Sequence, residues 1–549
     1  MPAPCCNLSA PLHVVQTLYQ NAGAPLGCHE TFGVPEHFKQ AFLTDSSARE
    51  KVPVIGSDSE ANPPREGSLV RFRGMVADME DPEYYYGCVK YKDGSWATSK
   101  YGGTGVIRSN EEPTDSRVWE RRPFHCVPVP GEASWVARAP NASEECTVYV
   151  YDQHDQNVPL HSVVDVIGVY TTAPEVVGLV EENKDEDQKT EALAPRAKHQ
   201  VHAIILDPQT EGTVSPEQQQ EREQLMGSSA RVLQAREAAL KLLQHALGGD
   251  ALGAEALLLS LLSQATTRAP GQPTTSSAPL NIILPPESPM TSAASAPSSS
   301  ATSAAASSSQ PSIPTSFGAA LHAVLGALSP LCTYLPLSVD HCNSCAWAPK
   351  RDFDNNRLSR SPLQLSNGTV LLVDETPMGE GRLSETGLSS FQALNTLIQE
   401  QALLYDFQVY KHPVPVNVTP IVLSKGRSMM HGSLPMKLHL KPSQALPTVA
   451  QVASAVAALN AQELQDIRTY LAAAKQQQYG LSESMVKQLQ EEFVAARKGN
   501  RMFSPENFHA QLTVARLAAL SFGEQDLSMD RWKYVLNFEK QLESREPKK

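Results

Sequence analysis

The sequence predicts a multidomain α+β protein whose folded parts are joined by linkers. Its 549 residues exceed what one hydrophobic core usually organises, so two or three domains are expected. Apolar residues make up 41% of the chain, which is enough to form cores, whereas 41 prolines and a long Ser/Ala tract indicate segments outside them. Alternating strand patterns near the start and helical periodicity further on supply the two kinds of element.

Helices are expected first, followed by a small β domain. Short apolar clusters such as LHVVQTLYQ predict one or two helices within residues 1–55. From Leu69 to Val76 apolar and polar residues alternate, which is typical of a half-buried strand. Similar strands are predicted at Thr147–Asp152 and Val163–Tyr170. Several short strands within residues 56–180 favour a small β-barrel of the oligonucleotide-binding (OB) type.

The first of these strands also suggests partner-binding residues. Its alternation places Val70 and Phe72 on a buried face and Arg71 and Arg73 on an exposed one. The two arginines could serve a protein partner, a phosphate group or solvent equally well. The candidate partner-binding residues of this domain are Arg71, Arg73, Asp78, Asp81 and Tyr84.

A linker and a helical region come next. Residues 181–225 begin with a highly charged stretch and are predicted to be a solvated linker, although HAIIL at 202–206 could return one strand to a sheet. Across 231–262 leucines recur at steps of three, four and seven, which predicts an amphipathic helix. The Gly-Gly pair at 248–249 ends that helix, and a second helix follows.

The rest of the chain contains an insertion and a helical end. Residues 285–316 are almost entirely Ser, Ala, Pro and Thr, so they are predicted to be a disordered insertion. Residues 441–540 are predicted to be helical, with one apolar stripe around Leu489 and another around Leu512. Ser504 followed by Pro505 predicts a helix start, because serine caps helices and proline is accepted in their first turn.

Charge and hydropathy disfavour several classes of function. The chain has 46 basic and 59 acidic residues, a net charge of −13, whereas dedicated nucleic-acid binders are normally basic. No apolar run approaches the ~20 residues needed to span a bilayer, and no secretory leader is recognisable, so no membrane partner is expected. Nine scattered cysteines fit a reducing compartment.

The sharpest candidate for enzymatic chemistry is LLVDE, residues 371–375. An apolar strand that ends in Asp-Glu is the Walker B arrangement, in which Asp374 would hold magnesium and Glu375 would orient water. That chemistry also needs a Gly-Lys phosphate loop, and no Gly-Lys dipeptide occurs in the chain. We therefore interpret the two acids as a strand-end turn and expect no cofactor, with weak ATP hydrolysis as the alternative.

Two other features can be interpreted either as ordinary parts of the structure or as functional sites. Cys342 and Cys345 form a CxxC pair beside His341, but no second CxxC exists, so ordinary thiols are favoured over structural zinc. Aromatic residues within 56–138 could stack on bases, yet acidic residues outnumber basic ones there. Packing is therefore favoured, with single-stranded DNA binding as the alternative.

Four collinear segments resemble a known family. SLVRFRGMVADMEDPEYYYG resembles the opening signature of the mini-chromosome maintenance (MCM) complex-binding protein family. Residues 352–376, 404–430 and 508–532 resemble later blocks of the same family, in the same order. The likeness covers most of the chain outside the linkers, and four blocks in order are far more specific than one motif.

The resemblance implies a non-enzymatic nuclear partner of the MCM replicative helicase. It implies binding to MCM subunits and an indirect link to chromatin, with roles in complex assembly, chromatin release and sister-chromatid cohesion. It also implies a degenerate AAA-like domain, in which Pro285 and Pro286 replace the glycines of a phosphate loop and Asp374 and Glu375 are a vestigial Walker B pair.

Together these inferences divide the chain as follows. The expected parts are a helical segment at 1–55, an OB-like β domain at 56–180, a linker at 181–225, a degenerate AAA-like α/β domain at 226–284 and 317–440 with the insertion 285–316, and a lid-like helical domain at 441–540.

Overall fold

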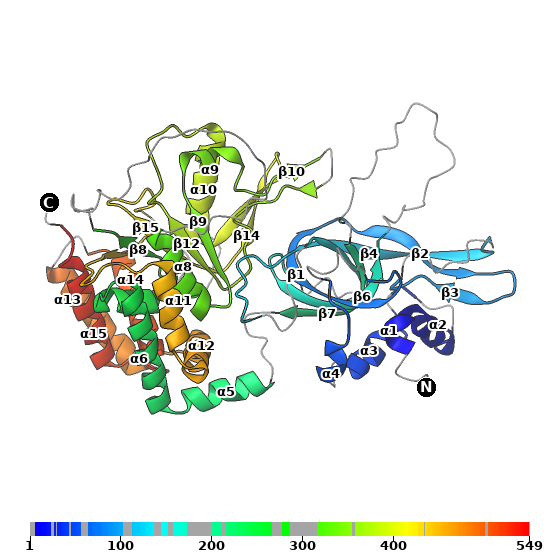
Figure 1. Ribbon diagram of the computed structural model, residues 1–549, viewed down its shortest axis with the longest axis horizontal. Coiled ribbons are helices and arrows are strands. Elements are labelled where there is room, and N and C mark those ends of the chain that lie inside the picture. Colours follow the sequence, from blue (N-terminus) through cyan, green and yellow to red (C-terminus); the bar gives the residue numbers. More distant parts are fainter. Residues whose placement is uncertain are drawn as a thin grey trace, which may run out of the picture. The chain divides into compact units, whose positions relative to one another are not determined.

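The computed structural model contains two compact units, each with its own sheet (Figure 1). The first comprises Met1–Thr213, Ala348–Asn367 and Leu404–Val416, and the second Val214–Trp347, Gly368–Leu403 and Asn417–Lys549. The described residues are 6–23, 27–28, 30–42, 46–55, 64–102, 112–136, 144–151, 158–172, 197, 199–209, 216–265, 277–285, 316–353, 357–432, 434–499 and 503–547. Within them, no helix is long and apolar enough to cross a membrane.

The sheet of the first unit has seven strands, five of which close into a ring. The strands are β1 (Leu69–Met79), β2 (Glu83–Lys90), β3 (Trp96–Thr98), β4 (Asp115–Val127), β5 (Cys146–Tyr151), β6 (Val163–Thr171) and β7 (His199–Gln209). β1 pairs with both β6 and β4, β4 pairs with β5, and β7 joins β5 to β6. All these pairs are antiparallel except β5 with β7. The predicted strands are confirmed, including the returning strand at 202–206.

Both faces of this ring are covered. Val70, Phe72 and Val76 of β1 lie fully buried with apolar residues of β4, β5 and β6. Four helices lie beside the strands on the other face (Figure 1). They are α1 (Cys6–Ser9), α2 (Pro11–Asn21), α3 (Val34–Phe42) and α4 (Ser46–Glu50). Their buried Val15, Tyr19 and Phe38 pack with strand residues such as Trp119. The expected N-terminal helices are therefore present and cover the barrel.

Two later segments also belong to the first unit, which corrects the prediction that placed them in the α/β domain. They contain β10 (Arg351–Asp352), β11 (Arg357–Leu358), most of β13 (Ala402–Asp406) and β14 (Lys411–Pro415). The buried hydroxyl of Tyr405 lies 2.8 Å from His161 Nε2 and accepts a 3.0 Å hydrogen bond from Gln364 Nε2. Gln364 also donates to the carbonyl of Ala77 in β1, at 3.2 Å. These long-range contacts leave no local signal in the sequence.

The second unit has a five-stranded sheet in which every pairing is parallel. In spatial order its strands are β16 (Met436–His439), β8 (Leu280–Ile283), β15 (Val418–Ser424), β12 (Thr369–Asp374) and β9 (Cys332–Pro336). All residues of β12 and β15 are buried, as expected for parallel strands covered on both faces. Thus the buried run LLVD forms a central strand.

The second unit also contains helices. They are α5 (Pro216–Met226), α6 (Ser229–Ala246), α7 (Ala251–Leu261), α8 (Phe317–Leu328), α9 (Val339–Ser344), α10 (Glu385–Glu400), α11 (Val449–Ala458), α12 (Ala461–Gln476), α13 (Glu483–Gly499), α14 (Pro505–Ser521) and α15 (Met529–Glu543). All of them except α9 and α10 contribute residues to one large core with this sheet. The break between α6 and α7 lies at the predicted glycines, which both have positive φ. Ser504 caps α14 through Asn507 N at 3.3 Å, as predicted.

The predicted linker and insertion lie partly outside the described residues. Of the range 181–225, residues 181–196 are not among them, whereas β7 and most of α5 are. α5 is polar, yet it packs on α12, and Arg222 Nη1 donates to Gln476 Oε1 at 2.7 Å. Residues 286–315 of the insertion also lie outside the described part of the chain.

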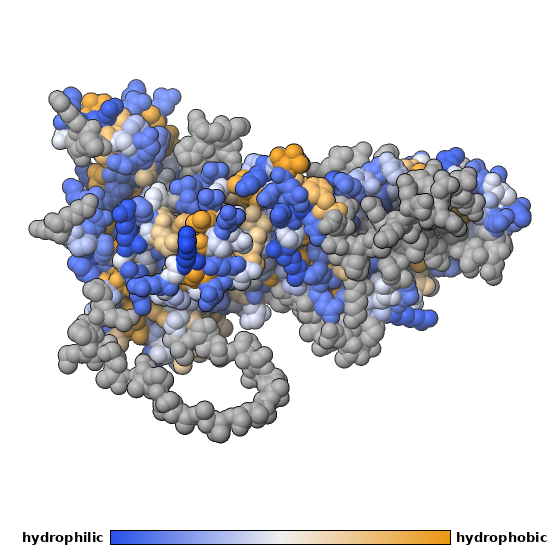
Figure 2. Space-filling view, turned by 90° about the horizontal axis from the view of Figure 1, so that it is seen from above, coloured by the Kyte–Doolittle hydropathy of each residue, from blue (hydrophilic) through white to orange (hydrophobic). Residues whose placement is uncertain are grey.

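Hydrophilic residues predominate on the surface shown in Figure 2.

Replacing Tyr405 with phenylalanine should destabilise the first unit. The change leaves His161 and Gln364 buried without the hydroxyl, which costs about 1–3 kcal/mol. Urea unfolding of the full-length chain, with hydrogen exchange over β1 as the local readout, measures the loss. Tyr410→Phe is the matched control because Tyr410 is 59% exposed, and its effect should stay within about 0.5 kcal/mol. Equal effects of the two changes would contradict the role of the buried hydroxyl.

Candidate functional site

The two acids of LLVDE lie at the carboxyl edge of the parallel sheet, where ligands of open α/β sheets usually bind. Asp374, the last residue of β12, is fully buried. Its Oδ2 accepts a 2.7 Å hydrogen bond from the hydroxyl of Tyr334, and its Oδ1 accepts one from Thr376 N at 2.9 Å. Burial raises the pKa of Tyr334 to about 12, so this hydroxyl keeps its proton.

The first turn of α8 lies directly on this carboxylate. A Cβ atom at Gly318 would lie 2.2 Å from Asp374 Oδ2 and 2.9 Å from the Tyr334 hydroxyl. Only glycine therefore fits without a shift. The amino end of α8 carries partial positive charge, which favours a carboxylate at this place. Asp374 is thus held by a tyrosine, a backbone amide and a helix end.

Glu375 is held in a similar way by the loop after β15. It is 8% exposed and accepts hydrogen bonds from Ser428 Oγ at 2.9 Å and from Met429 N at 3.3 Å. Burial raises the pKa of Glu375, while the hydrogen bond from Ser428 opposes the rise. Both acids therefore act as hydrogen-bond acceptors that fix the loops at this edge.

The CxxC segment shows no metal centre in the part of the chain that the structure describes. No group of three or more His, Cys, Asp and Glu side chains there could hold a metal ion. Cys342 is buried in α9, whereas Cys345 is exposed after it. His341 Nδ1 lies 2.9 Å from the carbonyl oxygen of Pro336, which occupies that ring nitrogen.

The partner-binding candidates in the barrel do not share one exposed face, which corrects the expectation for Arg71. Arg71 is 7% exposed, and its Nε donates to Asp165 Oδ1 in β6 at 2.9 Å. That hydrogen bond raises the pKa of Arg71. Arg49 of α4 donates to the same carboxylate at 2.8 Å. The outer face of β1 around Leu69 and Arg71 is thus covered by the N-terminal helices, and Arg71 neutralises a buried acid.

The other candidates divide into engaged and exposed residues. Asp78 is buried 3.6 Å from Arg351 Nη1, and burial raises its pKa. Arg73 is half-buried in an ion pair with Glu132. Asp81 and Tyr84 are exposed around the β1–β2 turn, and the Tyr84 side chain is 58% exposed. The sequence did contain one sign that this face of β1 is buried. Leu69, which lies on the same face of the strand as Arg71, is apolar.

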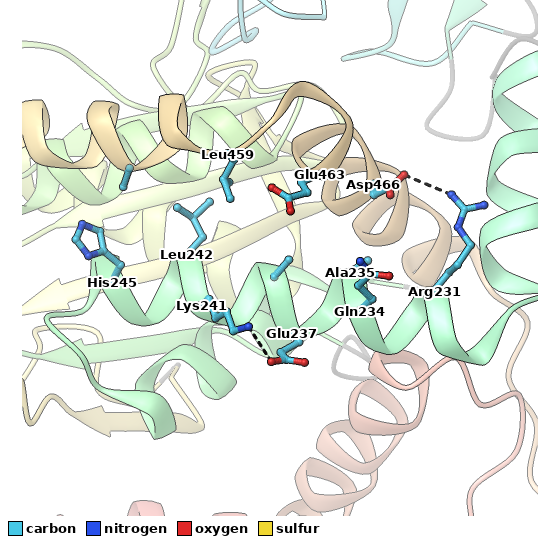
Figure 3. Close-up of a pocket in the computed structure, with 12 residues that line it drawn as sticks. Arg231, Gln234, Ala235, Glu237, Lys241, Leu242, His245, Leu459, Glu463 and Asp466 are labelled. Atoms are coloured by element: carbon cyan, nitrogen blue, oxygen red, sulfur yellow. Dashed lines mark hydrogen bonds and ion pairs between the residues drawn. The ribbon is translucent and has the colours of Figure 1, made fainter.

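A hollow that the sequence did not predict lies between α6 and the α11–α12 turn (Figure 3). Its volume is about 370 Å³, and Ala235, Ala238, Leu242 and Leu459 line its apolar part. The charged side chains around it pair within the chain: Arg231 Nη2 with Asp466 Oδ1 at 3.4 Å, and Lys241 with Glu237 at 2.8 Å. These two ion pairs thus engage four of the polar side chains around the hollow.

Gly318→Ala should destabilise the second unit by about 1–3 kcal/mol, because the new methyl group overpacks the Asp374 carboxylate and Tyr334. The matched control is Gly326→Ala in the same helix, where the new methyl group would meet no neighbouring atom within 4 Å and helix propensity predicts a gain of up to about 1 kcal/mol. Denaturant unfolding of both variants measures the difference. Stabilisation by both alanines would show that α8 does not press on Asp374.

Comparison with known proteins identifies the family. The family described as mini-chromosome maintenance replisome factor matches residues 38–145 and 139–546. Proteins named mini-chromosome maintenance complex-binding protein are similar to nearly the whole chain. The one from Arabidopsis thaliana is 26% identical over 592 residues (93% of this chain and 92% of the relative), that from Danio rerio 26% over 635 (96% and 95%), and that from Homo sapiens 23% over 657 (98% and 96%). This chain therefore belongs to the mini-chromosome maintenance replisome factor family.

Proposed function

We propose that this chain binds subunits of the MCM helicase as a non-catalytic partner. The observation that carries the proposal is that relatives matching 93–98% of the chain are named for binding the MCM complex. We extend it to a nuclear protein that regulates assembly or chromatin release of the complex during DNA replication and supports sister-chromatid cohesion. Contact with chromatin is then indirect, through MCM subunits.

The two sheets support an interface role. The ring of β1, β4, β5, β7 and β6, with one parallel pair, is compatible with an OB-like barrel. The parallel sheet, the Asp-Glu pair after β12 and the C-terminal helices are compatible with a degenerate AAA-like domain and lid. A module related to MCM subunits could keep the large side faces through which such modules associate after losing catalysis.

The state of the two acids supports a non-catalytic role. Asp374 is already bonded to Tyr334 and Thr376, and Glu375 to Ser428 and Met429. Walker B chemistry would need these carboxylates to face magnesium and water. The net charge of −13 likewise favours a protein partner over DNA.

Affinity purification of the tagged full-length chain from the nuclear and cytoplasmic fractions of proliferating cells tests the binding role. MCM subunits should co-elute in near-stoichiometric amounts from the nuclear fraction, without bound nucleotide. The tag alone is the control for background. Recovery of the chain without any MCM subunit from either fraction would overturn the proposal.

Phosphate release from ATP tests the absence of catalysis. The purified chain should stay at background, and Glu375→Gln should change nothing, because the Glu375 carboxylate is bonded to Ser428 and Met429 N. Glu380→Gln, an exposed acid five residues further on, is the matched control. Release that falls with Glu375→Gln and not with Glu380→Gln would establish an ATPase instead.

A further inference from the structure

The turn between β13 and β14 presents an apolar surface. Val409 is 90% exposed and Tyr410 is 59% exposed, although both are large apolar side chains. Phe353, just after β10, is 57% exposed, and Gln408 Nε2 donates to the carbonyl of Arg351 at 3.2 Å, which places the two segments side by side. Three large apolar side chains exposed on adjacent segments differ from the singly scattered apolar residues that are normal on a protein surface, so this group invites a functional explanation.

The turn is held in a strained conformation. Val409 N donates to the Phe407 carbonyl at 2.7 Å, which forms a γ-turn centred on Gln408 with φ of +62°. This kind of turn is rare and costs free energy in a residue other than glycine. Asp406 Oδ1 accepts from Gln408 N at 2.8 Å, and the rings of Phe407 and Tyr410 stack at 5.1 Å. These contacts hold Val409 outward.

The base of the turn is equally fixed. Tyr405, two residues before Phe407, is buried in the hydrogen-bond network with His161 and Gln364. Val414, on the other strand, is buried as well. A partner would therefore meet a preformed surface and spend little free energy on ordering it, which favours tight association.

The sequence of β14 determines how a partner can bind. Pro413 and Pro415 have no backbone N–H, so this strand is a poor template for the addition of a partner strand. Recognition must therefore use side chains. Lys350 and Lys411 are exposed around the apolar tip, whereas Asp406 is half-buried and bonded to Gln408. Among the residues that the structure describes there, Lys350 and Lys411 are thus the fully exposed charged side chains of the rim, in a chain of net charge −13.

We propose that Val409 and Tyr410 form an anchor that inserts into an apolar pocket with an acidic rim on a protein partner. The proposal rests on the function proposed above, and it names an MCM subunit as that partner. Aromatic side chains at the centre of an interface commonly carry most of its binding energy, and a basic rim speeds association with an acidic surface.

Binding of full-length wild type and the Val409→Ser/Tyr410→Ser double variant to purified MCM complex tests the anchor. We expect the double variant to bind at least about thirtyfold more weakly, as for a truncated interface anchor. Val494→Ser and Leu388→Ser are matched controls, since these apolar side chains are 50% and 51% exposed elsewhere and should leave affinity unchanged. Hydrogen exchange over β13 and β14 checks that the double variant keeps the fold.

The outcomes separate the two proposals. Wild type that binds no MCM subunit overturns the proposed function and the anchor together. Wild type that binds while the folded double variant binds equally well overturns the anchor alone. A double variant that loses affinity for a labelled single-stranded oligonucleotide, but not for the MCM complex, would show that the turn contacts nucleic acid instead. Lys411→Glu should slow association with the MCM complex most at low salt, and a salt-independent effect would contradict the acidic rim.

Discussion

The buried hydroxyl of Tyr405 joins parts of the chain that are far apart in sequence. It connects His161 of the barrel with Gln364, and Gln364 in turn bonds to the carbonyl of Ala77 in β1. Each of these polar groups is buried, so each depends on the others for a hydrogen bond. The barrel, the segment 348–367 and the β13–β14 turn are consequently one folded entity. A fragment that ends at residue 213 would lack two of its parts.

The sequence was sufficient to predict those elements whose position is determined by neighbouring residues. The positions of the strands β1 and β6, the glycines after α6 and the serine-proline start of α14 each depend on nearby residues, and these positions were predicted correctly. The burial of Arg71 could not be read in this way, because its partner Asp165 lies 94 residues further on. The same limit applies to 348–367 and 404–416, whose place depends on contacts with the barrel.

The Asp-Glu pair shows how a motif can be located correctly while its use is set by its surroundings. LLVD forms a central buried strand, as the sequence suggested. No local pattern revealed that Gly318 would bring α8 against Asp374, or that Ser428 would engage Glu375. Function on a shared fold depends on such neighbours rather than on the strand itself.

The division of the first unit along the chain has a consequence for biosynthesis. Its last segment ends at Val416, whereas its first ends at Thr213, so 416 − 213 = 203 further residues must be translated before the unit is complete. At about 5–20 residues per second this takes roughly 10–40 s. Until Arg351 and Gln364 are translated, the nascent barrel lacks the groups that bond to Asp78 and to the Ala77 carbonyl. Premature termination in this interval leaves a barrel with uncompensated polar groups, a natural substrate for chaperones and proteases.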